Sequence, residues 1–174
     1  MKSAVLFSMG IFILSSVTLG AIPIQQATSE KKNHYFSSGV FVGGFEQGPL
    51  TLLNVRHSYS DSSRLERLVL DFSNLKSSEV KRPGFFHASI QQNKYGVKRI
   101  VLDLSDILQM KVTEKQVRQL LSKSRFFSSV AFYKDELSKS ITVELILKTE
   151  IKCEVFELAS HDKPGRIVID VKAS

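Results

Sequence analysis

The sequence predicts a mainly β fold, a β-sandwich of two small sheets with one short capped helix. Short alternations of apolar and polar residues recur from residue 50 onward, with turn residues between them. This spacing is typical of a sandwich or a partly closed barrel. One stretch near residue 114 has helical periodicity, and the lack of alternating helices excludes parallel βαβ units. Finally, one hexapeptide pattern occurs three times, as RLVLDF, RIVLDL and RIVIDV.

Each hexapeptide alternates at the period of a strand, so its second, fourth and sixth residues share a face. We expect this face in the core: Leu68, Leu70 and Phe72, then Ile100, Leu102 and Leu104, then Ile167, Ile169 and Val171. The other face carries an arginine and an aspartate on either side of a valine: Arg67 and Asp71, Arg99 and Asp103, Arg166 and Asp170. The two charges of one strand lie about 13 Å apart at about 3.3 Å per residue. They cannot bond each other, so the pattern predicts ion pairs between neighbouring antiparallel strands on a half-solvated face.

Residues 1–21 are expected to be a secretory signal peptide. Lys2 precedes an apolar run over residues 4–14, and small residues suit cleavage after Gly20 or Ala21. The alternative is a retained membrane anchor, but the run is shorter than the roughly 20 apolar residues that span a bilayer. We therefore expect an exported, periplasmic protein without a stable membrane span after cleavage.

Residues 22–49 are rich in Gln, Ser, Lys and Gly and are expected to form a flexible leader, with the folded domain over residues 50–174. Apolar residues within the leader, Val40, Phe41, Val42 and Phe45, are the ones that can dock on the edge of the domain.

The domain begins with two expected hairpins. The strand containing Leu53 and Val55 leads into the first hexapeptide, and the strand containing Phe86 leads through an NKYG turn into the second. A helix is then expected from Glu114 to Lys123, because Thr113 and Gln116 form a capping box ahead of an apolar stripe. This helix is either a lid over one end of the core or a partner-binding element.

The clearest period-2 strand follows over residues 141–147. In the next strand the apolar phase shifts from Ile151, Cys153 and Val155 to Phe156 and Leu158, which predicts a bulge or bend near Phe156. Cys153 is the only cysteine and is expected to be buried, so no intramolecular disulfide can form.

The sequence gives little support for catalysis. The four histidines are scattered and no zinc-binding or nucleotide-binding motif occurs, although a metal site assembled from distant loops stays open. Asp71, Asp103 and Asp170 are candidates for a carboxylate pair, but an arginine neighbour lowers a carboxylate pKa and suits an ion pair better. We expect no enzyme activity and no cofactor. Loss of the signal lysine lowers the formal charge from +7 to +6, which favours anionic envelope polymers over nucleic acid because no basic run is present.

The C-terminal part of the chain resembles the end of the AMIN domain family. In that family a strand pair is followed by a Pro-Gly-Arg or Pro-x-Arg turn and a closing R-h-V-h-D-h strand, where h is apolar, and residues 141–171 have this order. The segment LLNVRHS, a serine-rich loop and RLVLDF are similar to the family's opening hairpin. The resemblance covers residues 50–172, except for the helical region at about residues 107–127, which looks like an insertion.

The resemblance implies a non-catalytic cell-envelope module that binds peptidoglycan and localises amidases or secretins. No amidase or secretin domain follows here, so we expect a free-standing module that acts alone or through an envelope protein. Its ligand-binding surface would be the polar faces of the hexapeptide strands, where arginines bind the carboxylates of peptide stems. The candidate residues are Arg56, Arg67, Asp71, Arg99, Asp103, Arg166 and Asp170.

Two alternatives to this surface stay open. The charged residues of the hexapeptides can be interstrand ion pairs with no ligand. The protein can also be an assembly factor of an envelope machine, which docks through an exposed strand edge or through the helix near residues 117–121.

Overall fold

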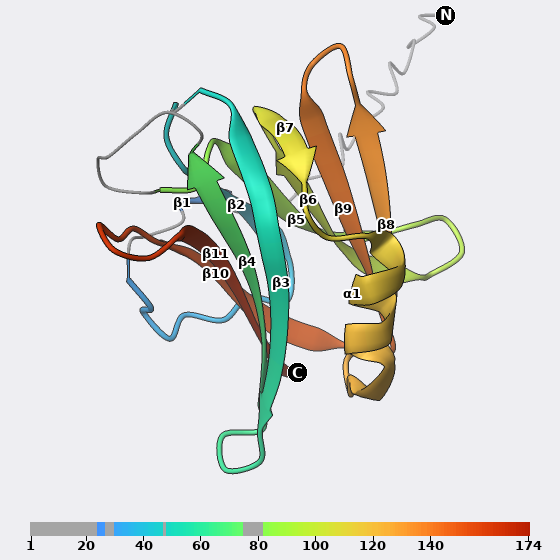
Figure 1. The fold of residues 1–174 in the computed structure, drawn as a ribbon. Coiled ribbons are helices and arrows are strands. Elements are labelled where there is room, and N and C mark those ends of the chain that lie inside the picture. Colours follow the sequence, from blue (N-terminus) through green and yellow to red (C-terminus); the bar gives the residue numbers. More distant parts are fainter. Residues whose placement is uncertain (1–23, 27–29, 47, 75–81) are drawn as a thin grey trace, which may run out of the picture.

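Two β-sheets packed face to face form the fold of the protein (Figure 1). The computed structural model describes residues 24–26, 30–46, 48–74 and 82–174. Within these residues six strands form one sheet and five strands form the other. The predicted two-sheet, mainly β fold with one short capped helix is therefore confirmed for the described chain. The expected signal peptide lies outside the described residues.

The five-stranded sheet holds two of the three hexapeptides side by side. Its strand order is β10, β11, β4, β3 and β7, with β7 parallel to β3 and the other pairs antiparallel. The strands are β3 (Leu50–Ser60), β4 (Leu65–Asn74), β7 (Ile107–Met110), β10 (Ile151–Leu158) and β11 (Gly165–Ala173). The expected first hairpin is β3–β4, and the last hexapeptide on β11 pairs antiparallel with the first on β4.

The six-stranded sheet holds the remaining hexapeptide on β6. Its strand order is β1, β2, β5, β6, β9 and β8, where β1 runs parallel to β2 and every other neighbouring pair is antiparallel. The strands are β1 (Ile24–Gln26), β2 (Gly39–Gly43), β5 (Phe86–Gln92), β6 (Lys98–Leu104), β8 (Phe127–Asp135) and β9 (Ser140–Leu147). The second expected hairpin, β5–β6, is confirmed.

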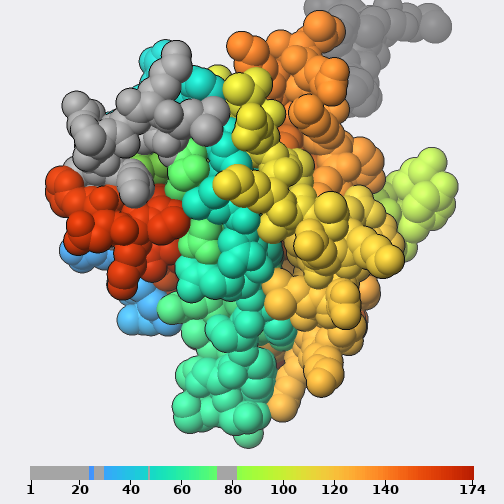
Figure 2. Space-filling view, in the orientation of Figure 1, coloured from blue at the N-terminus to red at the C-terminus, as the bar shows by residue number. Residues whose placement is uncertain are grey.

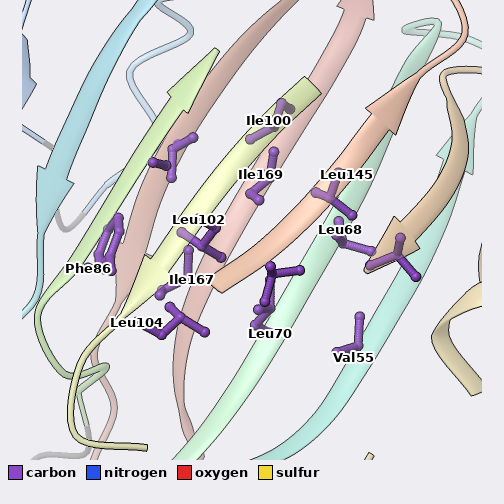
Figure 3. Close-up of a cluster of buried hydrophobic side chains, with 14 of the residues drawn as sticks. Val55, Leu68, Leu70, Phe86, Ile100, Leu102, Leu104, Leu145, Ile167 and Ile169 are labelled. Atoms are coloured by element: carbon purple, nitrogen blue, oxygen red, sulfur yellow. The ribbon is translucent and has the colours of Figure 1, made fainter. Parts of the chain in front are cut away.

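The core lies between the sheets and is built largely from the hexapeptides. Figure 3 shows Leu102 and Leu104 of one sheet meeting Leu70 and Ile167 of the other. All nine apolar residues predicted to face the core are buried in one cluster. The strand period alone therefore assigned the inward faces correctly. Cys153 is buried in the same cluster, as expected.

The outer face of the five-stranded sheet differs from the half-solvated surface that was expected. Val69, Phe156 and Val168 are buried there in a second apolar cluster, with Leu158 packed against it. This cluster also explains the apolar phase shift in β10, because both faces of that strand are covered. The prediction of a bulge near Phe156 is wrong: β10 pairs with β11 without a register shift from Ile151 to Leu158.

The prediction of a flexible leader over residues 22–49 is wrong for its described part. Strand β2 pairs with β5, and Phe41 on β2 is buried in the core. Phe36 exchanges two backbone hydrogen bonds with Cys153 on β10, of 2.9 and 2.8 Å. The segment therefore bonds to both sheets and closes one flank of the sandwich, because the edge of each sheet offers it free backbone groups.

The other flank is closed by helix α1 (Glu114–Leu120), which continues as a 3₁₀ turn over Leu121–Lys123. The predicted capping box between Thr113 and Gln116 is present. Val117 and Leu121 are buried in the core, so this face of the helix acts as a lid. Figure 2 shows this flank, with the gold surface of α1 next to the teal surface of β3.

Candidate functional site

The seven candidate residues do not form one site, because the hexapeptides are divided between the two sheets. Arg99 and Asp103 lie on β6 in the six-stranded sheet. The other five candidates, Arg56, Arg67, Asp71, Arg166 and Asp170, lie on β3, β4 and β11 in the five-stranded sheet. Each hexapeptide points its apolar residues into the shared core. The charged residues of the two sheets therefore point to opposite outer faces of the sandwich.

On the five-stranded sheet, Asp170 is fully buried and paired. Arg67 lies opposite it in register and donates from Nε and Nη2 to its two carboxylate oxygens, at 2.6 and 2.7 Å. Lys31 contacts the same carboxylate at 3.1 Å. The hydrogen bonds to Asp170 raise the pKa of Arg67 above its usual value. This arrangement confirms the predicted ion pairing between neighbouring hexapeptides and leaves Asp170 inaccessible to a ligand.

A second fork-shaped pair connects β3 and β4. Arg56 donates from Nε and Nη2 to the two oxygens of Asp71, at 2.7 Å each. Arg166 lies opposite Asp71 in register on β11, but its buried Nε has no hydrogen-bond partner among the described residues. Asp71 is nevertheless bonded by the arginine of the neighbouring strand. Four of the five candidates on this sheet thus stabilise the sheet as matched charges.

The outer face of the six-stranded sheet is more open. One row crosses five strands in register, in the order Val42, His87, Asp103, Thr142 and Tyr133. Asp103 accepts a hydrogen bond of 2.6 Å from Thr142 and lies 3.2 Å from Nδ1 of His87. The side chain of Asp103 is 46% exposed. This carboxylate is therefore held in place by its neighbours and still reaches solvent.

Polar groups from two further rows surround Arg99 on the same face. Arg99 donates to Glu144 at 2.8 Å and to Gln91 at 3.5 Å, and Gln91 in turn donates to Ser89. Tyr133 is 57% exposed at the β8 end of the face, and Val42 is 42% exposed at the β2 end. The face therefore offers hydrogen-bond donors and acceptors between two apolar or aromatic margins.

Sequence reasoning found two members of this face and missed the rest. His87, Thr142 and Glu144 carry no motif, and they join Arg99 and Asp103 only through strand pairing. The alternation within β9 does place Thr142 and Glu144 away from the core, which is a signal that could have identified them as surface residues. No local sequence pattern predicts which strands pair with β6.

One buried polar cluster outside the hexapeptides also escaped the sequence analysis. Glu66 is fully buried at the inner face of β4, where it accepts hydrogen bonds from the Ser124 hydroxyl and from the Arg125 N–H at 2.9 Å. His57 Nε2 lies 2.8 Å from the same carboxylate. The serine donates to Glu66 and not to the histidine, so the cluster lacks the nucleophile–base contact of a hydrolase. It connects the 3₁₀ turn to β3 and β4.

Within the part of the chain that the structure describes, no three His, Cys, Asp or Glu side chains are placed to hold a metal ion. No helix there has the length and apolar character needed to cross a membrane. No protein-family model matches this chain, and the comparison with curated proteins finds no relative.

Proposed function

We propose that this protein is an exported, non-catalytic module that binds peptidoglycan or another cell-envelope polymer through the outer face of its six-stranded sheet. The resemblance of residues 50–172 to the AMIN domain supports the envelope role. The expected signal peptide supports a periplasmic location. Among the hexapeptide residues, Arg99 and Asp103 are the natural contacts for such a polymer.

The observation that carries the proposal is the row from His87 through Asp103 to Thr142, with Tyr133 at its end. The hydroxyl, carboxylate and imidazole of this row offer both donors and acceptors to sugar hydroxyls or peptide amides. An exposed sheet face accommodates an extended polymer, and an exposed tyrosine adds apolar contact with a polar tip. Arg99 lies two rows from Asp103 on the same face and is paired with Glu144 at 2.8 Å. Its contact with Gln91 is long, at 3.5 Å, so its Nη2 can bind a stem carboxylate.

Retention of the mature protein on purified cell-wall sacculi tests this proposal. Arg99→Ala combined with Tyr133→Ala should lower retention at least about tenfold, since two contacts are lost from one face. Arg56→Ala is the matched control, because Arg56 is an exposed arginine on the opposite face. Lack of retention of the unmodified protein would reject wall binding. Equal loss in both variants would reject the assigned face.

A second candidate function is docking of an envelope protein, favoured by a hollow of about 290 Å³ between α1 and β3. Its lining is mixed, with the apolar residues Leu53, Val112, Val117 and Leu120 beside the polar residues Asn54, Lys111 and Gln116. Leu120 is 37% exposed. Glu114 of α1 accepts the backbone N–H of Phe132 at 3.0 Å, so the helix already covers part of the β8 edge. Cross-linking in whole cells with a photoreactive residue at position 120 would trap a discrete protein if this function holds.

A further inference from the structure

A cavity of about 160 Å³ lies where the N-terminal segment crosses the edge of β10. Its apolar lining comes from Phe36, Phe41 and Val155, and the rings of Phe36 and Phe41 meet edge to face with centroids 6.0 Å apart. Its polar lining comes from Gln25, Lys32, His34 and Glu154. The cavity is on the flank of the sandwich and shares no residue with the polymer-binding face described above.

Glu154 is the unusual member of this lining. The residue is 5% exposed, and its Oε1 accepts the backbone N–H groups of Lys32 and His34, at 2.8 and 3.3 Å. Its Oε2 is buried and has no hydrogen-bond partner in the described chain. Leaving a buried carboxylate oxygen without a donor is costly, and such atoms are rare in folded proteins. A donor that enters the cavity would supply the missing bond.

Lys32 and His34 line the same cavity and supply hydrogen-bond donors, whereas Glu154 supplies an acceptor. Their backbone N–H groups are fixed on Glu154, and both residues are exposed, with side chains that have no hydrogen-bond or ion-pair partner within the described residues. An ammonium and an imidazole can both donate to an anion. A buried carboxylate oxygen without a donor and two solvent-exposed donors that are free to bind an anion therefore line one small space.

The size of the cavity limits the ligand. Sites for drug-sized molecules run from about 300 to 1,000 Å³, so this cavity admits a smaller compound. We infer that it binds a free, small, apolar α-amino acid in its zwitterionic form. The ammonium of the amino acid bonds Glu154 Oε2, its carboxylate contacts Lys32 and His34, and its aliphatic side chain packs on Phe36, Phe41 and Val155. This inference is independent of the proposed polymer binding.

The probes are L-leucine and D-leucine. Each is titrated into the ¹⁵N-labelled mature protein, and the amide chemical shifts of the protein are followed by NMR. Saturable shifts of the Lys32, His34 and Glu154 amides with either enantiomer are expected. N-acetyl-leucine lacks the ammonium and leucinamide lacks the carboxylate, so each should bind at least about tenfold more weakly. Absence of a saturable shift with leucine, or equal binding of all three compounds, would overturn the inference.

Two variants locate the site. Glu154→Gln keeps an oxygen for the two backbone N–H groups and removes the charge, so it should fold and weaken leucine binding at least about tenfold. Glu157→Gln is its matched control, because Glu157 is an equally buried glutamate of β10 that bonds Gly44 and does not line the cavity. Lys32→Ala should also weaken binding, whereas Lys152→Ala should not. Unchanged binding in both Glu154→Gln and Lys32→Ala would overturn the inference.

This experiment separates the two sites. Loss of sacculus retention in the Arg99 and Tyr133 variant with intact leucine binding would support two independent sites. Loss of leucine binding in that same variant would contradict the placement of the amino-acid site.

Discussion

Arg67 on β4 and Asp170 on β11 form an ion pair between two hexapeptides, with two hydrogen bonds of 2.6 and 2.7 Å to a carboxylate that is 0% exposed. Removal of one partner from a buried pair leaves an uncompensated charge. We expect Arg67→Ala to lower the free energy of unfolding by about 2–4 kcal/mol, with Lys31 compensating in part. Urea denaturation measures this loss.

Arg166→Ala is the control for that measurement. Arg166 holds the same position in its hexapeptide, yet its Nε has no hydrogen-bond partner among the described residues. Its replacement should cost less than about 1 kcal/mol. If both substitutions destabilise the protein equally, the ion pair is not the cause.

Phe41 tests whether the N-terminal segment belongs to the fold. Its side chain is 3% exposed in the core, so Phe41→Ala should lower the free energy of unfolding by about 3–5 kcal/mol. Phe45→Ala should have little effect, because Phe45 is 50% exposed a few residues later in the same segment. A thermal melt of each variant makes the comparison. Equal melting temperatures would indicate that the segment is not docked.

Glu66 should make the protein sensitive to acid. Burial opposes its charged form, but the contacts from His57, Ser124 and the Arg125 N–H outweigh burial and lower the pKa of Glu66 below 4.5. A lowered folded-state pKa gives stability that is fully present above the unfolded value and is lost as the pH falls through the folded value. We therefore expect the free energy of unfolding to decrease below pH 4.5.

Glu66→Gln provides the comparison, because glutamine does not titrate. Its free energy of unfolding should fall less steeply over the same acid range. Urea titrations of both proteins at a series of pH values supply the two curves. Parallel curves would show that other carboxylates cause the acid sensitivity.

Cys153 should be unreactive in the native protein. Burial raises the pKa of its thiol to about 12, so almost no thiolate forms near neutral pH. Iodoacetamide at pH 8 should label Cys153 only after denaturation, which mass spectrometry can follow. Rapid labelling under native conditions would contradict the burial of β10.

The sequence was sufficient for features with a local period. The inward residues of the hexapeptides follow from alternation within each strand, and the Thr113–Gln116 capping box follows from a spacing of three. The sequence did not predict how the three hexapeptides are divided between the two sheets. Whether Arg99 lies beside Arg67 or on the opposite face depends on pairing between strands that are distant in the chain. No property of residues 99–104 distinguishes the two outcomes.

Two further errors have physical causes. The composition of the segment around β2 is typical of a linker. The segment is nevertheless part of the fold, because Phe41 packs in the core and β2 pairs with the edge of β5. A phase shift such as that at Phe156 indicates a bulge only in a strand with one solvated face. Both faces of β10 are covered, so apolar residues in both phases are compatible with a regular strand.

The order in which the chain visits the two sheets has a kinetic consequence. Hairpin β3–β4 belongs to the five-stranded sheet, β5–β6 to the other, and the chain changes sheets again at β7, β8 and β10. The six-stranded sheet takes its last strand from β9, but the five-stranded sheet is completed only when the last hairpin, β10–β11, pairs with β4. This pairing closes a long loop, which costs chain entropy. Because the inner faces of both sheets share one core, refolding should be a single slow event, on the order of milliseconds to seconds, with no half of the molecule persisting by itself.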